Sequence, residues 1–523
     1  MGTQIVASYS ADVASEHTLR QVYRWIAECQ SCHPLCRQDH SSFIPRRLLH
    51  IDLGTKTAIV RLVETREDLQ CRWAALSYVW GGDQKLKTTL SSIADMKAGI
   101  KLERLPQTLQ DAVTVCRALR LELLWVDALC IIQDDQEDLD RELASMPQIY
   151  QKAWVTISAS AAATVSDGFL QQRCYSHEKT PIALPYLADE GLDTCGIICL
   201  PDAGSICTSY LDNNEPINQR AWTYQERRLS QRVLDFNHSQ VVLYCYTNKR
   251  CQGSGSLEDW SEDSEESRLY KPVSDHQALP EWRDIVDVYV TRKVSFASDR
   301  LKAISALADI YRQRTGYTYL AGLWEESLVY DLCWKTGENE VLPRPREYRA
   351  PSWSWAAVDV VASYRNGSRK PQRIYSDEPY HTTIAQATVT DVSVRQEPPN
   401  TTFGRIYAGC LTLEAPMLWT KWDYLVTNLE LGQKSAFVTR DAKGDCWIEE
   451  DGNINSSVLA VLLTRTASTK VKGVTIYCGL VLVPASEGMY RRVGLFEFFD
   501  PNVDVDDDEG FRSLFNVHII III

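Results

Sequence analysis

Four side chains of the kinds that bind zinc lie close together near the N-terminus. The stretch "WIAECQSCHPLC" contains Cys29, Cys32, His33 and Cys36. Thiolate and imidazole are the usual ligands of tetrahedral Zn²⁺, but zinc knuckles normally add a second, distant pair of ligands. The same spacing continues a helix face that begins at Leu19, which indicates core packing. The sequence favours packing and predicts no metal, and these four residues remain the candidate ligands.

A second candidate for chemistry is the apolar stretch "LWVDALCIIQDD", which predicts a buried strand. Asp127, Gln133 and Asp134 predict a polar rim where that strand ends. Asp127 either contacts a ligand there, caps a helix or pairs with an arginine such as Arg220. Cys130 has no histidine near it in the motifs to activate its thiol, so we expect it to be a small buried hydrophobe rather than a nucleophile.

Composition and charge limit the class of protein. A chain of 523 residues exceeds the roughly 250–300 residues at which one hydrophobic core stops growing, so two or more units are expected. Its net charge of -14 opposes binding to nucleic acid and to anionic membranes. No secretory signal or membrane-spanning run is found, and the 16 cysteines suit reduced thiols. We therefore expect a cytoplasmic protein without nucleic-acid or membrane partners.

The elements that must position these residues fall into several regions. Strand-like runs alternate with helix-like runs in one region, which is the pattern of a layered α/β domain. The segment "PSWSWA" predicts a buried strand with bulky side chains on one face. The sequence does not explain the terminal "IIIII", for which an ordinary terminal strand is the simplest interpretation. The predicted regions are an N-terminal helical Cys/His segment (1–45), the α/β domain (46–250), an acidic linker or loop (251–275), a helical extension with the PSWSW segment (276–375) and a β-rich C-terminal region (376–523).

Three ordered motifs in the α/β domain resemble the HET (heterokaryon incompatibility) domain of filamentous fungi. They are "WAALSYVWGG" (73–82), "LPQTLQDAVTVCRALRLELLWVDALCIIQDD" (105–135) and "QRAWTYQERRLSQRVLDF" (219–236). The chain departs from the family pattern at Ile132, where Asn is usual, and at Ala221, where Gly is usual. The resemblance implies an intracellular self/non-self recognition protein whose domain triggers regulated cell death through protein partners or self-assembly.

The family is also described as distantly similar to TIR domains, some of which cleave NAD with a glutamate that follows a tryptophan. Trp222 and Glu226 are four residues apart, so they share one face of a helix. A carboxylate there would stabilise the oxocarbenium-like state of nicotinamide–ribose cleavage. The resemblance therefore implies Glu226 as a catalytic residue and NAD as a substrate. The remaining candidate ligand-binding residues are Ser77, Tyr78, Trp80, Gly81, Asp127, Gln133, Asp134 and Trp222.

A structural role competes with this chemistry, and the sequence favours it. Glu226 would then pair with Arg220, Arg227 or Arg228, while Trp222 fills the core. No Walker lysine loop, dinucleotide glycine fingerprint or zinc-protease motif occurs, so no cofactor is predicted and NAD enters only as a substrate. We expect a signalling or interaction protein. The alternatives are a TIR-like NAD hydrolase and a metabolic enzyme built on the same scaffold.

Overall fold

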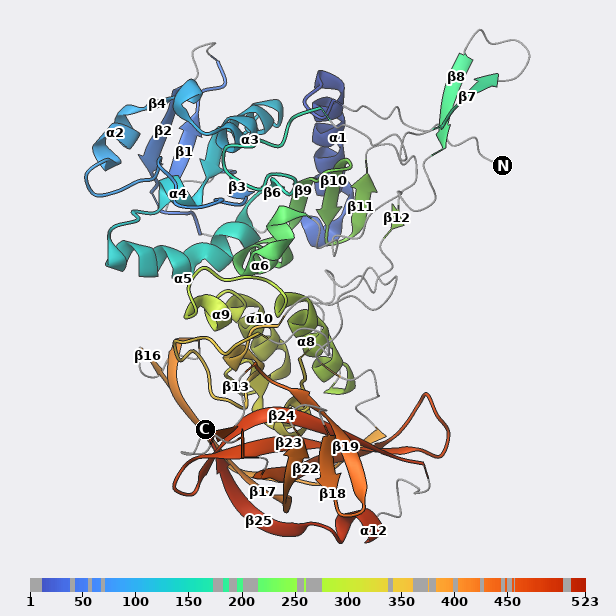
Figure 1. The fold of residues 1–523 in the computed structure, drawn as a ribbon. Coiled ribbons are helices and arrows are strands. Elements are labelled where there is room, and N and C mark those ends of the chain that lie inside the picture. Colours follow the sequence, from blue (N-terminus) through green and yellow to red (C-terminus); the bar gives the residue numbers. More distant parts are fainter. Residues whose placement is uncertain are drawn as a thin grey trace. The chain divides into compact units, whose positions relative to one another are not determined.

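The computed structural model separates into two units, residues Met1–Lys271 and Pro272–Ile523, and each is described by itself (Figure 1). The predicted acidic linker lies outside the described residues except for Cys251, the strand β12 and the first residue of α8. The structure describes residues 12–37, 43–54, 59–66, 71–172, 182–187, 195–200, 215–251, 258–259, 275–336, 342–360, 375, 382–397, 403–423, 428–443, 447–448, 454–455, 457–501 and 509–523.

The N-terminal unit is built on one mixed sheet, which confirms the α/β class. Four parallel strands form its centre, in the spatial order β5-β3-β6-β9. β3 and β6 are buried along their whole length, as expected for strands covered on both faces. The central strands are β3 (Ala74–Ser77), β5 (Leu123–Trp125), β6 (Val155–Ser158) and β9 (Arg232–Phe236). Antiparallel strands continue the sheet at both sides: β1 (Arg47–Ile51), β2 (Ile59–Glu64), β4 (Ile100–Lys101), β10 (Val241–Cys245), β11 (Asn248–Cys251) and β12 (Glu258–Asp259).

Helices cover both faces of this sheet. The chain moves one way along the sheet from β3 to β5 and the other way from β5 to β6, so right-handed crossovers place the two connecting helices on opposite faces. In Figure 1, α1 and α3 lie on one side of the sheet, and α5 and α6 lie on the other. The helices of this unit are α1 (Glu16–Cys32), η1 (Pro34–Cys36), α2 (Ile93–Ala98), η2 (Leu102–Arg104), α3 (Gln107–Ala118), α4 (Asp127–Cys130), α5 (Gln136–Lys152), η4 (Pro216–Gln219) and α6 (Ala221–Leu229). A separate hairpin consists of β7 (Ile182–Leu187) and β8 (Cys195–Leu200).

The prediction of one long strand in "LWVDALCIIQDD" was wrong, because β5 ends at Trp125 and the next residues form the single turn α4. The Asp127 carboxylate accepts a hydrogen bond from the Ala128 N–H at 2.7 Å, and Arg47 Nε donates to the Cys130 carbonyl at 2.6 Å. These bonds satisfy backbone groups of the turn that would pair with a neighbouring strand if the segment were extended. Burial alone does not distinguish a short buried helix from a strand.

The C-terminal unit opens with helices, which confirms the predicted helical segment. Its elements before the β-rich part are α8 (Asp275–Tyr289), α9 (Asp299–Lys302), α10 (Ser305–Thr315), β13 (Tyr319–Leu320), β14 (Leu323–Trp324), η5 (Glu325–Ser327), α11 (Leu328–Asp331) and η6 (Trp355–Ala357). "PSWSWA" forms a turn and η6 rather than the predicted strand, because the Ser354 hydroxyl caps η6 by accepting from the Ala356 N–H at 3.0 Å. Trp353 and Trp355 are both fully buried. The bulky side chains therefore lie in the core as expected, but a turn and a short helix place them there instead of a strand.

The remainder is β-rich, as predicted, and its strand pairings close on themselves. The ring runs β22-β23-β24-β19-β18-β17 and returns to β22, which makes an antiparallel barrel around an apolar core. The strands are β15 (Thr383–Ala385), β16 (Thr388–Glu397), β17 (Arg405–Asp423), β18 (Asn428–Leu431), β19 (Lys434–Arg440), β20 (Trp447–Ile448), β21 (Ile454–Asn455), β22 (Ser457–Ala467), β23 (Thr475–Ser486), β24 (Met489–Asp500) and β25 (Asn516–Ile522), with the short helix α12 (Glu509–Arg512) before the last.

The terminal isoleucine run belongs to a strand, which agrees with its simplest interpretation. β25 pairs antiparallel with β17 and parallel with β24. Ile520 and Ile522 are buried whereas Ile519 is exposed, so the side chains alternate between core and surface.

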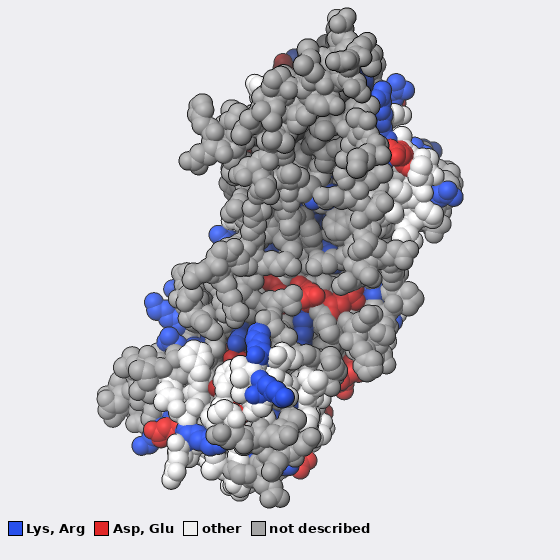
Figure 2. All heavy atoms as spheres, turned by 90° about the vertical axis from the view of Figure 1, so that its right-hand side faces the viewer, with Lys and Arg blue, Asp and Glu red and all other residues white. Residues whose placement is uncertain are grey.

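The lengths of the helices and the charges on the surface can also be compared with the sequence. None of the helices formed by the described residues has the length and apolarity needed to cross a membrane. On the face drawn in Figure 2, basic and acidic side chains are interspersed over the described part of the surface.

Candidate functional site

The candidate site lies at the carboxyl ends of the parallel strands. The order β5-β3-β6-β9 places a topological switch point between β3 and β6, since the chain leaves these neighbours in opposite directions. Open α/β sheets bind ligands at such a point, beyond the carboxyl ends of the strands. Ser77 and Ser158 are the last residues of β3 and β6 and lie opposite each other in the ladder. Ser158 is in turn opposite Asp235 of β9.

Glu226 reaches this point from α6. Its side chain is buried, and the Ser77 hydroxyl donates a hydrogen bond to Glu226 Oε2 at 2.5 Å. Burial raises the pKa of Glu226 to about 7, although the Ser77 bond, the charge of Arg220 and the nearby Tyr150 hydroxyl oppose the shift. Among the described residues, no arginine or lysine forms an ion pair with Glu226. The carboxyl group therefore changes its charge near neutral pH.

The sequence offered ion pairs between Glu226 and nearby arginines as the alternative to a catalytic role. In the structure, Arg220 and Arg227 bind other groups. Arg227 binds Asp235 at 3.3 Å instead of Glu226, and its guanidinium lies 4.4 Å from the centre of the Tyr244 ring. Arg220 donates from NH1 to the Tyr78 carbonyl at 2.6 Å. Arg220 lies close enough to influence Glu226 by charge, but neither arginine neutralises the carboxylate by direct contact.

Asp127 supplies a second carboxylate directly after β5. Trp80 Nε1 donates to Asp127 Oδ2 at 2.8 Å, which brings together two residues predicted for the site. Burial raises the pKa of Asp127, and the charge of Arg220 and the bond from Trp80 oppose the shift. The negative charge of Asp127 in turn contributes to the raised pKa of Glu226. The two acids therefore disfavour each other's ionised form.

Two buried tyrosines complete the polar cluster. Gln84 Nε2 donates to the Tyr78 hydroxyl at 2.8 Å, and the Tyr150 hydroxyl donates to the Leu76 carbonyl at 3.0 Å. Burial raises the pKa of both phenols well above the usual value, so they remain protonated hydrogen-bond donors. Tyr150 was not predicted for the site, although it lies in the stretch "MPQIYQKAWVTISAS", because its helix spacing in α5 also fits ordinary core packing.

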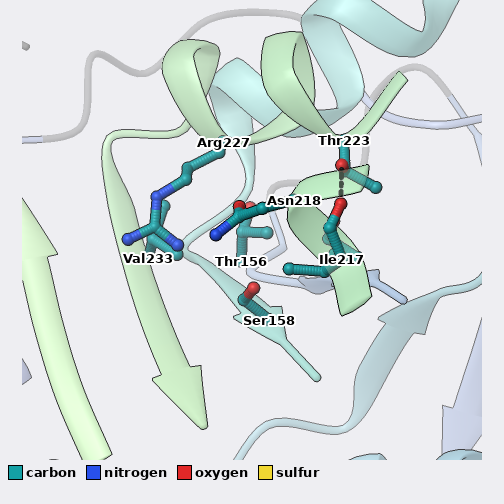
Figure 3. A pocket seen from close by; sticks show the side chains of 8 residues that line it. Thr156, Ser158, Ile217, Asn218, Thr223, Arg227 and Val233 are labelled. Carbon is teal, nitrogen blue, oxygen red and sulfur yellow. Dashed lines mark hydrogen bonds between the residues drawn. The ribbon is translucent and has the colours of Figure 1, made fainter. Parts of the chain in front are cut away.

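A small cavity adjoins the cluster at the switch point (Figure 3). Its volume is about 10 Å³, which is enough for about one water molecule. Pockets for cofactors or drug-sized ligands measure roughly 300–1,000 Å³. Thr223 closes one side, with its hydroxyl donating to the Ile217 carbonyl at 2.7 Å. The lining residues are Ser77, Thr156, Ser158, Ile217, Asn218, Thr223, Arg227 and Val233.

The other predicted site residues have different surroundings. Gly81 has a φ of +74°, and a Cβ there would lie 2.5 Å from the Thr164 side chain, so only glycine fits. Gln133 Nε2 donates to the Asp127 carbonyl at 3.1 Å, and Asp134 accepts from the Leu90 N–H at 2.8 Å. The side chains of Gln133 and Asp134 therefore bind backbone groups and stabilise the loops around α4. Trp222 lies half-buried on α6, one turn before Glu226.

A group of metal-binding side chains lies elsewhere in the same unit. Ligand atoms of Cys29, His33, Cys36 and Cys245 lie within 4.8 Å of one another. The predicted candidate Cys32 is exposed and outside this group, because it faces away on α1. The sequence could not indicate Cys245, which is more than 200 residues away in the chain and reaches the group through β10.

Residues 73–226 match the model of the family described as heterokaryon incompatibility protein (HET). No curated protein and no solved structure matches the chain.

Proposed function

This chain contains a HET domain, and from that premise we propose that it is a heterokaryon incompatibility protein that triggers regulated cell death through protein contacts or self-assembly. The observation that carries the choice of contacts over chemistry is the small size of the cavity at the switch point. The cavity there has a volume of about 10 Å³, so a substrate would have no space beside Ser77 in this conformation.

The polar groups around the cavity support the same choice, because they bind one another. Glu226 accepts from Ser77, and Asp235 binds Arg227 and accepts from the Ser160 hydroxyl. Thr156 and Ser230 share a hydrogen bond of 2.6 Å between their hydroxyl oxygens. A buried polar network of this kind makes a domain rigid and specific in shape. Such a domain is suited to present a defined surface to a partner.

Inducible expression of the full chain in a filamentous fungus tests the proposal. We expect loss of viability with the natural chain, because the folded domain would engage the death response. The Glu226→Gln variant should kill to the same extent, since contacts and not the carboxylate carry the effect. The measurement is the fraction of cells that exclude a vital dye, at matched protein abundance.

Two neighbouring arginines provide the controls for that experiment. Arg46→Met changes an exposed side chain and should kill like the natural chain, whereas Arg47→Met removes a buried one and should kill less because it weakens the fold. Full viability of cells that hold abundant, folded natural chain would contradict the proposal.

NAD cleavage by Glu226 is the second candidate function. The observation that favours it is the buried carboxyl with a pKa of about 7 at the switch point, since strongly shifted acids are enriched at active sites. Trp222, one turn earlier on α6, would stack on the nicotinamide or adenine ring, and the ionised Glu226 would stabilise the oxocarbenium-like state. This candidate requires the cavity to open by more than tenfold in volume.

A further inference from the structure

Three thiols and one imidazole converge where the N-terminal helix meets the sheet. Cys29 lies on α1, His33 and Cys36 lie at its end and in η1, and Cys245 is the last residue of β10. The four ligand atoms lie within 4.8 Å of one another, and the three thiols are buried. We propose that these four residues bind one Zn²⁺ ion that fastens α1 and η1 to the sheet.

The ligand set and its geometry fit zinc. Three cysteines and one histidine are a usual tetrahedral set for structural zinc, and ligand atoms around such an ion lie roughly 3–4 Å apart. The histidine Nδ1 lies 3.5 Å from the Cys245 sulfur. With four protein ligands no coordination position is left open, so the ion would be structural rather than catalytic. On binding, each thiol would give its proton to the solvent and become a thiolate.

Hydrogen-bond donors surround the sulfurs, as thiolates require. Arg232 Nε donates to the Cys29 sulfur at 3.3 Å, and the Asn248 N–H donates to the Cys245 sulfur at 3.3 Å. The Thr247 hydroxyl lies 3.7 Å from the Cys36 sulfur. A neutral thiol is a weak acceptor, whereas a thiolate accepts strongly from such groups.

The buried charge of Arg232 gives an independent reason for a negative site. Its side chain is completely buried, and its described partners are the Trp154 and Cys36 carbonyls, the Gln231 side-chain oxygen and the Cys29 sulfur. No carboxylate is among them in the described part of the chain. A buried guanidinium without an anion is costly. Three thiolates and one Zn²⁺ carry one negative charge together, which would balance Arg232.

Asn248 is placed to adapt to the metal-bound state. Its Nδ2 lies 3.2 Å from His33 Nε2, and its Oδ1 lies 3.4 Å from the Cys245 sulfur. When Nδ1 of His33 binds a metal, Nε2 carries the proton and needs an acceptor. A half-turn of the Asn248 amide would present Oδ1 to that N–H and Nδ2 to the sulfur. One residue would then support two ligands.

The test is the metal content of the full chain, expressed in zinc-supplemented medium and purified with a reductant. We expect about one zinc per chain. Cys245→Ser should lose the zinc. Cys32→Ser should keep it, because Cys32 is exposed on the same helix but outside the ligand group. Zinc retained in full by Cys245→Ser, or lost from Cys32→Ser, would overturn the assignment.

A second measurement does not depend on the folding of a variant. Natural chain in which Co²⁺ replaces zinc should show the intense thiolate charge-transfer and tetrahedral ligand-field absorption bands. Removal of the metal with a chelator should speed hydrogen exchange of peptides from α1, because the ion would no longer hold that helix to β10. Natural chain that takes up neither ion, or a mass spectrum showing a disulfide within the group, would overturn the proposal.

Discussion

Replacing Arg47 by methionine is expected to lower the free energy of unfolding of the N-terminal unit by about 3–5 kcal/mol. Arg47 is buried and binds both Asp138 and Glu142, the latter at 3.3 Å. Burial opposes ionisation of Asp138, but its bonds with Arg47 and the Ile132 N–H hold its pKa below the usual range, whereas burial raises the pKa of Glu142. Methionine would fill similar space and leave both acids without the buried cation that contacts them.

The matched control is the neighbouring arginine. Arg46 lies 3.7 Å from Asp138, but 52% of its side chain is exposed, so Arg46→Met should cost only about 0–1 kcal/mol. Hydrogen exchange of peptides from β1 and α5 measures the effect, with peptides from the C-terminal barrel as the internal reference. Equal exchange in the two variants would show that the buried group does not support this part of the fold.

Replacing Glu226 by glutamine is expected to stabilise the N-terminal unit as the pH rises. The pKa of Glu226 is raised from 4.5 to about 7 in the folded chain, so the folded state binds the proton more tightly than the unfolded state. The natural chain therefore loses stability between about pH 4.5 and pH 7, and the loss reaches about 3 kcal/mol. Glutamine stays neutral and still accepts from Ser77, so the variant would be free of this loss.

Hydrogen exchange of peptides from β3 and α6, compared between about pH 5 and pH 8, measures the difference after correction for intrinsic exchange. The advantage of Glu226→Gln should be small at the acid end and greatest above about pH 7. Glu64→Gln is the control, because Lys97 lowers the pKa of that exposed acid and the sign is reversed. A pH-independent difference for Glu226→Gln would contradict the assigned protonation behaviour.

The sequence predicted the classes of structure better than their details. Alternating apolar runs indicated the α/β domain and the β-rich C-terminal region, because such patterns follow directly from strand and helix periodicity. They did not indicate α4, whose turn depends on the bond from Arg47 to the Cys130 carbonyl and on the bond from the Ala128 N–H to the Asp127 carboxylate. Barrel closure was also not predictable, since the strands that close it, β17 and β22, pair in an antiparallel ladder although they are not consecutive in the chain.

The sequence also predicted only part of the candidate site, because it shows local motifs but not which distant segments meet. Ser77 and Glu226 were both named from motifs, but the 2.5 Å bond between them joins segments 149 residues apart in the chain. Ser158 was not named, although its position at the end of a strand in "VTISAS" resembles that of Ser77 and offered a signal. Cys245 had no such signal. Long-range partners follow from the fold and not from local spacing.

The most direct test of the account is release of nicotinamide from NAD by the purified full chain at high protein concentration, run beside Glu226→Gln. The small cavity of about 10 Å³ predicts no release by either protein, while the natural chain still kills when expressed in the fungus. Release by the natural chain that disappears in folded Glu226→Gln would contradict the account and establish Glu226 as the residue that cleaves NAD.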